Sequence, residues 1–212
     1  KDLFWYILMP LIIICILILP NNFSTAALVF INGLVLMFIG RVKIKFIFFT
    51  LITSFMLALS IYLFAKYTDI PSKIIPRSAT WVSRIDSFLF KKEGSIQTTD
   101  FQQTQALVAI QNGGIQGVGP GKSIQRNILP YSSSDFIFAI IIEEYGVIGG
   151  GVVIFLYLIL LFRAVKLALS TASVFGSLVA LGLMFSMVFQ ALINMLVSVE
   201  VLPVTGQTLP LI

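Results

Sequence analysis

The acids that border apolar runs are the residues of this sequence best suited to acid–base chemistry. Asp135 follows three consecutive serines and immediately precedes the apolar run Phe136–Ile142. An acid at this place can cap the first turn of a helix, where the helix dipole favours negative charge. It can also act as a general base, because partial removal from water at the mouth of an apolar bundle strengthens a carboxylate as a base. Both interpretations of Asp135 stay open from the residues alone.

Two further acids, Glu143 and Glu144, lie between apolar runs. Ionisable groups are costly in lipid, which makes them candidates for a functional role. The alternative is a turn at the membrane interface, in which both carboxylates reach water or a basic loop residue. Of the two, Glu144 is the stronger functional candidate.

A glycine-rich segment, Gly113–Gly121, is followed directly by Lys122 and Ser123. Free backbone amides in such a segment can cradle a phosphate, with Lys122 as the charge partner of a lipid-linked pyrophosphate. The segment is not a P-loop, because that pattern requires glycine where this chain has Gln116. The alternative is a tight turn at the membrane interface.

Composition places these residues in a membrane protein. The chain of 212 residues is 58% apolar and 11% charged, with a mean hydropathy of +1.02, whereas soluble domains are about 45–50% apolar and about 25% charged. It has no histidine and a single cysteine, Cys15. Serine–histidine triads, histidine metal cages and internal disulfides are therefore excluded. The net charge of +5 fits loop anchoring and anionic lipid rather than nucleic acid, because no basic stripe is interleaved with aromatics.

The elements that must position the polar residues are transmembrane helices, so the predicted fold is an all-α polytopic bundle. A bilayer core needs about 20 helical residues, and about five segments qualify or nearly do. The terminal stretch Pro203–Pro210 cannot be regular helix, because of its prolines. Lys1 stands where Met would be, and both ends fall within or beside apolar runs, so we expect a fragment. The five segments are Leu3–Leu19, Thr25–Gly40, Phe46–Ala65, Val147–Phe162 and Phe175–Val199.

Basic residues in short loops predict the orientation. Arg41, Lys43 and Lys45 lie between the second and third segments, and Arg163 and Lys166 between the fourth and fifth. The positive-inside rule places both loops in the cytoplasm. The predicted organisation is three transmembrane helices over 1–65, a large extracytoplasmic loop with interfacial helices and the catalytic region over 66–146, two transmembrane helices over 147–199, and a truncated re-entrant or broken segment over 200–212.

Several of these motifs together carry a family resemblance. They are Gly113–Gly121, Ser134-Asp135-Phe136, Glu143-Glu144-Tyr145-Gly146 and Pro203–Pro210. In this order and spacing they resemble the SEDS family, which comprises FtsW, RodA and SpoVE, and most of all its FtsW type. The likeness extends more weakly along the whole chain, where it includes Arg84, the pair Gln102 and Gln105, and the pair Gln190 and Asn194.

The resemblance implies a multi-pass protein of the bacterial inner membrane that polymerises lipid II into glycan strands at the extracytoplasmic face. The implied linkage is β-1,4 with inversion and a polyprenyl-pyrophosphate leaving group, in cell division or shape maintenance. Asp135 is the implied catalytic residue. The implied substrate-binding residues are Lys122, Arg84, Gln102, Gln105, Ser123, Ser134 and Glu144. The implied structural-motif residues are Gly114, Gly117, Gly119, Gly121, Asn194, Pro203, Thr205 and Gly206.

The resemblance also implies partners and an open question about metal. The partners are a cognate class B penicillin-binding transpeptidase, other divisome proteins and membrane lipids. No cofactor is required by the residues, and a divalent cation, Mg²⁺ or Mn²⁺, is compatible with a pyrophosphate although the sequence has no dedicated metal ligands. Two alternatives compete with an enzyme. A lipid II flippase should line a path through the bilayer with polar residues, whereas a non-catalytic divisome scaffold predicts that Asp135→Asn is silent.

Overall fold

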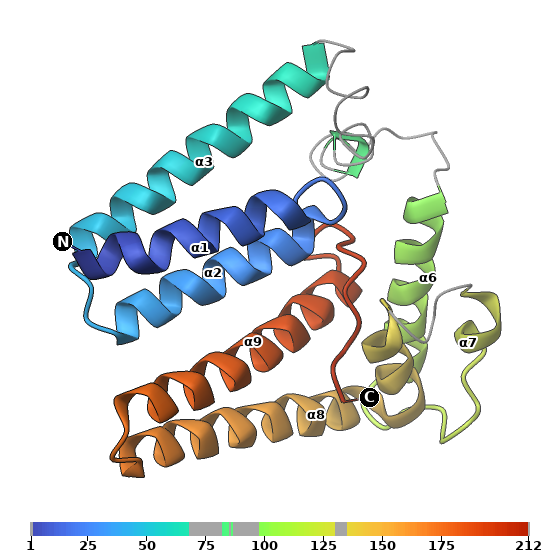
Figure 1. The fold of residues 1–212 in the computed structure, drawn as a ribbon. Helices are drawn as coiled ribbons and strands as arrows, with labels where there is room; N and C mark the ends of the chain where they lie inside the picture. The colour runs from blue at the N-terminus through green and yellow to red at the C-terminus, as the bar shows by residue number, and fades with distance from the viewer. Residues whose placement is uncertain (1, 68–81, 85, 87–97, 130–134, 212) are drawn as a thin grey trace. The chain divides into compact units, whose positions relative to one another are not determined.

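The computed structural model describes residues 2–67, 82–84, 86, 98–129 and 135–211, and within these ranges it contains helices and no strand. This confirms the predicted all-α fold class. Residues 82–84 and 86 are helical in addition to the seven labelled helices (Figure 1). The labelled helices are α1 (Asp2–Ile18), α2 (Phe23–Ile39), α3 (Ile44–Tyr67), α6 (Thr98–Gly113), α7 (Gln125–Ile128), α8 (Ile137–Ser170) and α9 (Val174–Ser198).

The five predicted apolar segments all lie in helices. Three of these helices are long and apolar enough to cross a membrane, namely α3 over Ile44–Phe64, α8 and α9. Helices α1 and α2 have 17 residues each, which at about 1.5 Å per residue falls somewhat short of a core of about 30 Å. The bounds of α1, α2, α3 and α9 lie within two residues of the prediction, because each apolar run is closed by a turn or a charge.

Helix α8 differs from the prediction at both ends. It runs from Ile137 to Ser170 and is interrupted at Gly146, whose backbone is non-helical with φ 72° and ψ −177°. The predicted span Val147–Phe162 therefore starts correctly after the break but stops too early. Arg163 and Lys166 were predicted in a loop, which is wrong, because they lie inside α8. Long basic side chains remain compatible with a helix near a membrane surface, since their alkyl stems reach back toward water.

The chain divides into two compact units, of which unit 1 comprises Lys1–Asp86 and Ala168–Ser186. Its helices α1 and α2 form a hairpin around a core of Leu8, Leu11, Leu34 and Met37. The turn is fixed by Asn22, whose side chain caps α2 by accepting a hydrogen bond from the Thr25 amide at 3.1 Å. An N-cap of this kind satisfies one of the amides that the first turn leaves unpaired.

Unit 2 comprises Ser87–Leu167 and Met187–Ile212. Its core joins α6, the start of α8, the end of α9 and the chain after α9. Alanines on α6 and α8 are fully buried, which permits close helix packing. Two clusters make up this core. One contains Ala106, Ala109, Leu129, Phe136, Ala139, Val197 and Val204, and the other Phe138, Ile142, Tyr157, Val188, Ala191, Met195 and Leu209.

Candidate functional site

The break in α8 is filled by the glycine loop, which we define as Gly113–Gly121. The amide of Val118 donates to the Glu143 carbonyl oxygen at 2.9 Å, and the amide of Gly119 donates to that of Glu144 at 3.0 Å. On the other side of the break, the Val147 amide donates to the Gly114 carbonyl at 2.9 Å. A helix interruption leaves carbonyls and amides without intrahelical partners. The glycine loop supplies those partners from a segment more than twenty residues earlier.

Glycine is required where the loop and the break meet backbone to backbone. Gly117 has φ 80°, and a Cβ there would overlap the carbonyl oxygen of Glu144. Gly146 has φ 72°, and a Cβ there would overlap the carbonyl oxygen of Ile115. The amides of Val118 and Gly119 already donate to carbonyls of α8. These two amides therefore fit a tight turn and do not form a phosphate cradle. The other predicted glycines, Gly114, Gly119 and Gly121, have φ of 52°, 106° and 71°.

Glu143 is buried and fixes the chain that follows the glycine loop. It is 1% exposed and accepts hydrogen bonds from the Ser123 hydroxyl and, at 3.4 Å, from the Gln125 amide. The Ser123 oxygen in turn accepts from the Arg126 amide at 3.0 Å. The alternative in which both carboxylates reach water or a basic loop residue is therefore wrong for Glu143, because Ser123 and Gln125 satisfy its carboxylate inside the protein. Its neighbour Glu144 is half-buried.

This arrangement also locates two predicted substrate-binding residues. Lys122 is exposed, and its amide donates to the Gly119 carbonyl at 3.2 Å. Ser123 is buried, with its hydroxyl directed to Glu143. Ser123 thus has an internal partner that the sequence did not predict, and substrate contact by either residue stays a prediction.

Asp135 lies half-buried just before α8, with its main chain held from two sides. The next residue, Phe136, is fully buried in the core of unit 2. The carbonyl oxygen of Asp135 accepts hydrogen bonds from the Asn194 side-chain amide at 3.2 Å and from the Ser198 hydroxyl at 3.4 Å. The predicted residue Ser134 falls outside the described residues. The structure therefore places a half-buried acid on an anchored main chain.

A polar stripe on α9 provides these donors. Gln190, Asn194 and Ser198 are spaced by four residues, and residues at that spacing share one face of a helix. Gln190 donates to the Thr208 carbonyl at 3.0 Å, and Asn194 donates to the Gln207 carbonyl at 2.7 Å as well as to Asp135. Sequence reasoning missed Ser198, although its spacing from Asn194 was a usable signal.

The terminal segment, residues 203–210, is non-helical as predicted. It runs back along α9, since successive carbonyls meet successively earlier side chains of the polar stripe, and Figure 1 shows it in red next to α8. The Tyr157 hydroxyl of α8 donates to the Pro210 carbonyl. Non-helical backbone at membrane depth needs such partners. Of the predicted motif residues here, Pro203 and Thr205 are half-buried and Gly206 is exposed with φ 68°.

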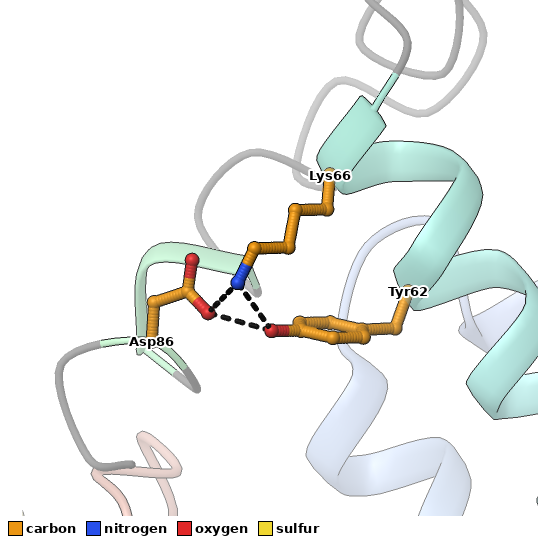
Figure 2. Close-up of polar contacts among 3 residues, drawn as sticks. All are labelled: Tyr62, Lys66 and Asp86. Atoms are coloured by element: carbon orange, nitrogen blue, oxygen red, sulfur yellow. Dashed lines mark hydrogen bonds and ion pairs between the residues drawn. The ribbon is translucent and has the colours of Figure 1, made fainter. Parts of the chain in front are cut away.

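In unit 1 a separate polar cluster holds the neighbourhood of Arg84. Figure 2 shows Tyr62 and Lys66 of α3 converging on Asp86. The Lys66 ammonium lies 2.8 Å from the Asp86 carboxylate, and the Tyr62 hydroxyl donates to the same oxygen at 2.6 Å. The hydrogen bonds to Asp86 and Tyr62 raise the pKa of Lys66 to about 12. Half-buried Arg84 is two residues before Asp86, so the cluster ties its segment to the end of α3.

The predicted pair Gln102 and Gln105 lies half-buried on α6. The two residues are three apart and therefore share a face of the helix. They belong to unit 2 with Asp135, Lys122 and the glycine loop, whereas Arg84 belongs to unit 1.

The long apolar helices thus define a polytopic membrane protein. Within unit 2 a glycine loop docks on a broken helix, and Asn194 joins the half-buried Asp135 to the returning terminal segment. The profile of the FtsW/RodA/SpoVE family, described as "Cell cycle protein", matches residues 1–212, and the chain belongs to this family. The family prediction is confirmed.

Individual relatives agree with this family assignment. Stage V sporulation protein E of Bacillus subtilis is 41% identical over 130 residues, which cover 61% of this chain and 35% of that protein. A probable peptidoglycan glycosyltransferase FtsW of Buchnera aphidicola is 34% identical over 222 residues, which cover 100% of this chain and 58% of that protein. This chain thus spans only about a third to somewhat over half of these relatives.

A solved structure also resembles the chain. It is described as "Structural coordination of polymerization and crosslinking by a peptidoglycan synthase complex" and matches with a TM-score of 0.61 at 25% identity. The match covers 92% of this chain and 50% of that one. The membrane-helix architecture is therefore shared with a structurally determined relative.

Proposed function

We propose that the protein to which this chain belongs is a peptidoglycan glycosyltransferase that polymerises lipid II into glycan strands, in cell division or shape maintenance. Family membership and the names of the relatives support this proposal. The observation that carries it is the half-exposed Asp135, anchored through its own carbonyl and through the buried Phe136. A general base must reach the substrate and must extend from a main chain that is held in place. The partial exposure and the anchored backbone of Asp135 meet both requirements.

In the proposed reaction Asp135 accepts the proton of the acceptor sugar's 4-hydroxyl as that oxygen attacks the donor's anomeric carbon. The bond from O4 to C1 forms while the bond from C1 to the pyrophosphate oxygen breaks. The electron pair of the broken bond leaves with polyprenyl pyrophosphate. Attack opposite the leaving group inverts the anomeric carbon and produces a β-1,4 linkage.

Negative charge that develops on the leaving pyrophosphate requires positive partners. Lys122 is exposed and follows the docked glycine loop, which fits this role. A role for Arg84, which belongs to unit 1, stays a prediction from the sequence. In the described part of the chain, no three His, Cys, Asp or Glu side chains group around a possible metal position. A divalent cation, Mg²⁺ or Mn²⁺, held mainly by the pyrophosphate oxygens would supply further positive charge, and this proposal stays compatible with one.

We propose that the site faces the extracytoplasmic side of the bacterial inner membrane, because Arg41 and Lys43 lie in the turn between α2 and α3 and basic short loops stay in the cytoplasm. The similarity to a chain of a peptidoglycan synthase complex supports a cognate class B penicillin-binding transpeptidase as partner. The other proposed partners are divisome proteins and anionic membrane lipids.

The test is polymerisation of purified lipid II by the full-length protein with its partner transpeptidase, comparing wild type, Asp135→Asn and Glu144→Gln. We expect glycan chains from wild type and none from Asp135→Asn, with both proteins folded in the membrane. If Asp135→Asn forms as much glycan as wild type, Asp135 is not the base and the result agrees with a scaffold. If only Glu144→Gln loses glycan formation, Glu144 is the base. If wild type produces no glycan but moves labelled lipid II between leaflets, the protein is a flippase.

A further inference from the structure

We propose that Asn194 is a positioning residue for Asp135, assisted by Ser198. This inference rests on the proposed function, in which Asp135 is the base. Neither α9 side chain needs to touch substrate. They act by fixing the backbone from which the Asp135 carboxylate extends.

The geometry of the Asn194 amide supports this role. A carboxamide nitrogen carries two N–H groups, and here they serve the Asp135 carbonyl at 3.2 Å and the Gln207 carbonyl at 2.7 Å. Asn194 is 1% exposed, so water does not compete for either bond. One buried side chain therefore joins Asp135, the terminal segment and α9.

The Asp135 side chain extends from the main chain that this joint holds. Phe136 is fully buried on the carboxyl side, and the Asp135 carbonyl is held by Asn194 and Ser198 on α9. A shift of the carbonyl therefore displaces the carboxylate directly.

The expected effect is on turnover more than on substrate binding. A displacement of a reacting group by about 1 Å can cost about 100-fold in rate. We therefore expect Asn194→Ala to lower kcat by about 10- to 100-fold while KM changes by less than about threefold. Ser198→Ala should lower kcat by a smaller factor, because its 3.4 Å contact is at the long end of the hydrogen-bond range.

The chain offers two matched controls. Gln190→Ala removes a donor from the same stripe and the same terminal segment, but the contact it breaks is with Thr208 and not with Asp135. Asn32→Ala removes an amide from α2, in unit 1. If Asn194→Ala lowers kcat more than Gln190→Ala does, the difference is due to the contact with Asp135.

The experiment uses the full-length protein in lipid nanodiscs and combines two measurements. Lipid II polymerisation gives kcat and KM, and amide hydrogen exchange over residues 135–142 reports the fixation of the backbone independently of activity. We expect faster exchange in Asn194→Ala and Ser198→Ala, and wild-type exchange there in Gln190→Ala and Asn32→Ala. Ser198→Ala leaves a smaller void and decides the matter if Asn194→Ala does not fold.

Two results would overturn the inference. One is unchanged exchange over residues 135–142 in Asn194→Ala or, where that variant does not fold, in Ser198→Ala. The other is a fall of kcat in Asn194→Ala no larger than that in Gln190→Ala, which would assign the effect to the terminal segment. Failure of the proposed function is a distinct outcome. Then wild type itself forms no glycan, while the exchange measurement still decides whether Asn194 holds the Asp135 main chain.

Discussion

Replacing Gly117 with alanine should detach the glycine loop from the break in α8. Gly117 has φ 80°, and an added Cβ would overlap the Glu144 carbonyl oxygen and the Gly146 amide. Both neighbours are backbone atoms, so they cannot move aside as a flexible side chain would. The loop must therefore shift away from α8.

The expected cost follows from two contributions. Holding a non-glycine residue at this positive φ costs about 1–3 kcal/mol. A shift of the loop also breaks the bonds from Val118 to Glu143 and from Gly119 to Glu144, each contributing about 0.5–1.5 kcal/mol. The free energy of unfolding should therefore fall by about 2–6 kcal/mol. Gly121→Ala is the matched control, because Gly121 has φ 71° and its Cβ meets no described atom within 4 Å.

The assay is reversible denaturant titration of the full-length protein in mixed micelles, with lipid II polymerisation measured on the same preparations. Gly121→Ala should show only the backbone contribution, so Gly117→Ala should be less stable than this control by about 1–3 kcal/mol, from the two hydrogen bonds. Equal destabilisation by the two variants would refute the argument that the loop docks on the helix break. It would mean that positive φ alone explains the requirement for glycine.

Two further predictions concern buried and exposed charge. Glu143→Ala leaves the Ser123 hydroxyl and the Gln125 amide without their acceptor. At about 1–3 kcal/mol for each of these two buried groups, we expect the free energy of unfolding to fall by about 2–6 kcal/mol in denaturant titration. Glu144→Ala is the milder control, and similar losses in both variants would contradict the buried role of Glu143. The pKa of Lys66 is raised from 10.5 to about 12 by Asp86 and Tyr62, so its stabilising contribution is complete below pH 10.5 and is lost as pH rises through 12. The stability difference between wild type and Lys66→Met should thus stay constant from about pH 7 to 10 and shrink above that, and a decline near neutral pH would contradict the assignment.

The helices were predictable because membrane insertion depends on local composition. An apolar run must be helical in lipid, since no other partner satisfies its backbone. The bounds of α1, α2, α3 and α9 followed from the residues that interrupt each run, such as Asn22 and Arg41. The same reasoning failed at Arg163 and Lys166, because two charges on a long helix resemble a loop in a one-dimensional pattern.

The family and the candidate base were also accessible from the sequence, through the order and spacing of short motifs around Asp135. The roles of the buried polar residues were not. Glu143 and Glu144 are adjacent and chemically identical, yet only Glu143 is enclosed by Ser123 and Gln125. Which of two neighbouring side chains turns inward depends on where the helix breaks.

The sequence by itself determined that this chain is a helical membrane protein, which segments cross or approach the bilayer, and which acid is the candidate base. Only the tertiary structure decided what the glycine loop and the polar stripe do. The loop's amides bind carbonyls of α8, and the stripe's side chains bind carbonyls of Asp135 and the terminal segment. These pairings join residues far apart in the chain, and a backbone amide or carbonyl has no sequence signature, so its partner is known only once the chain has folded.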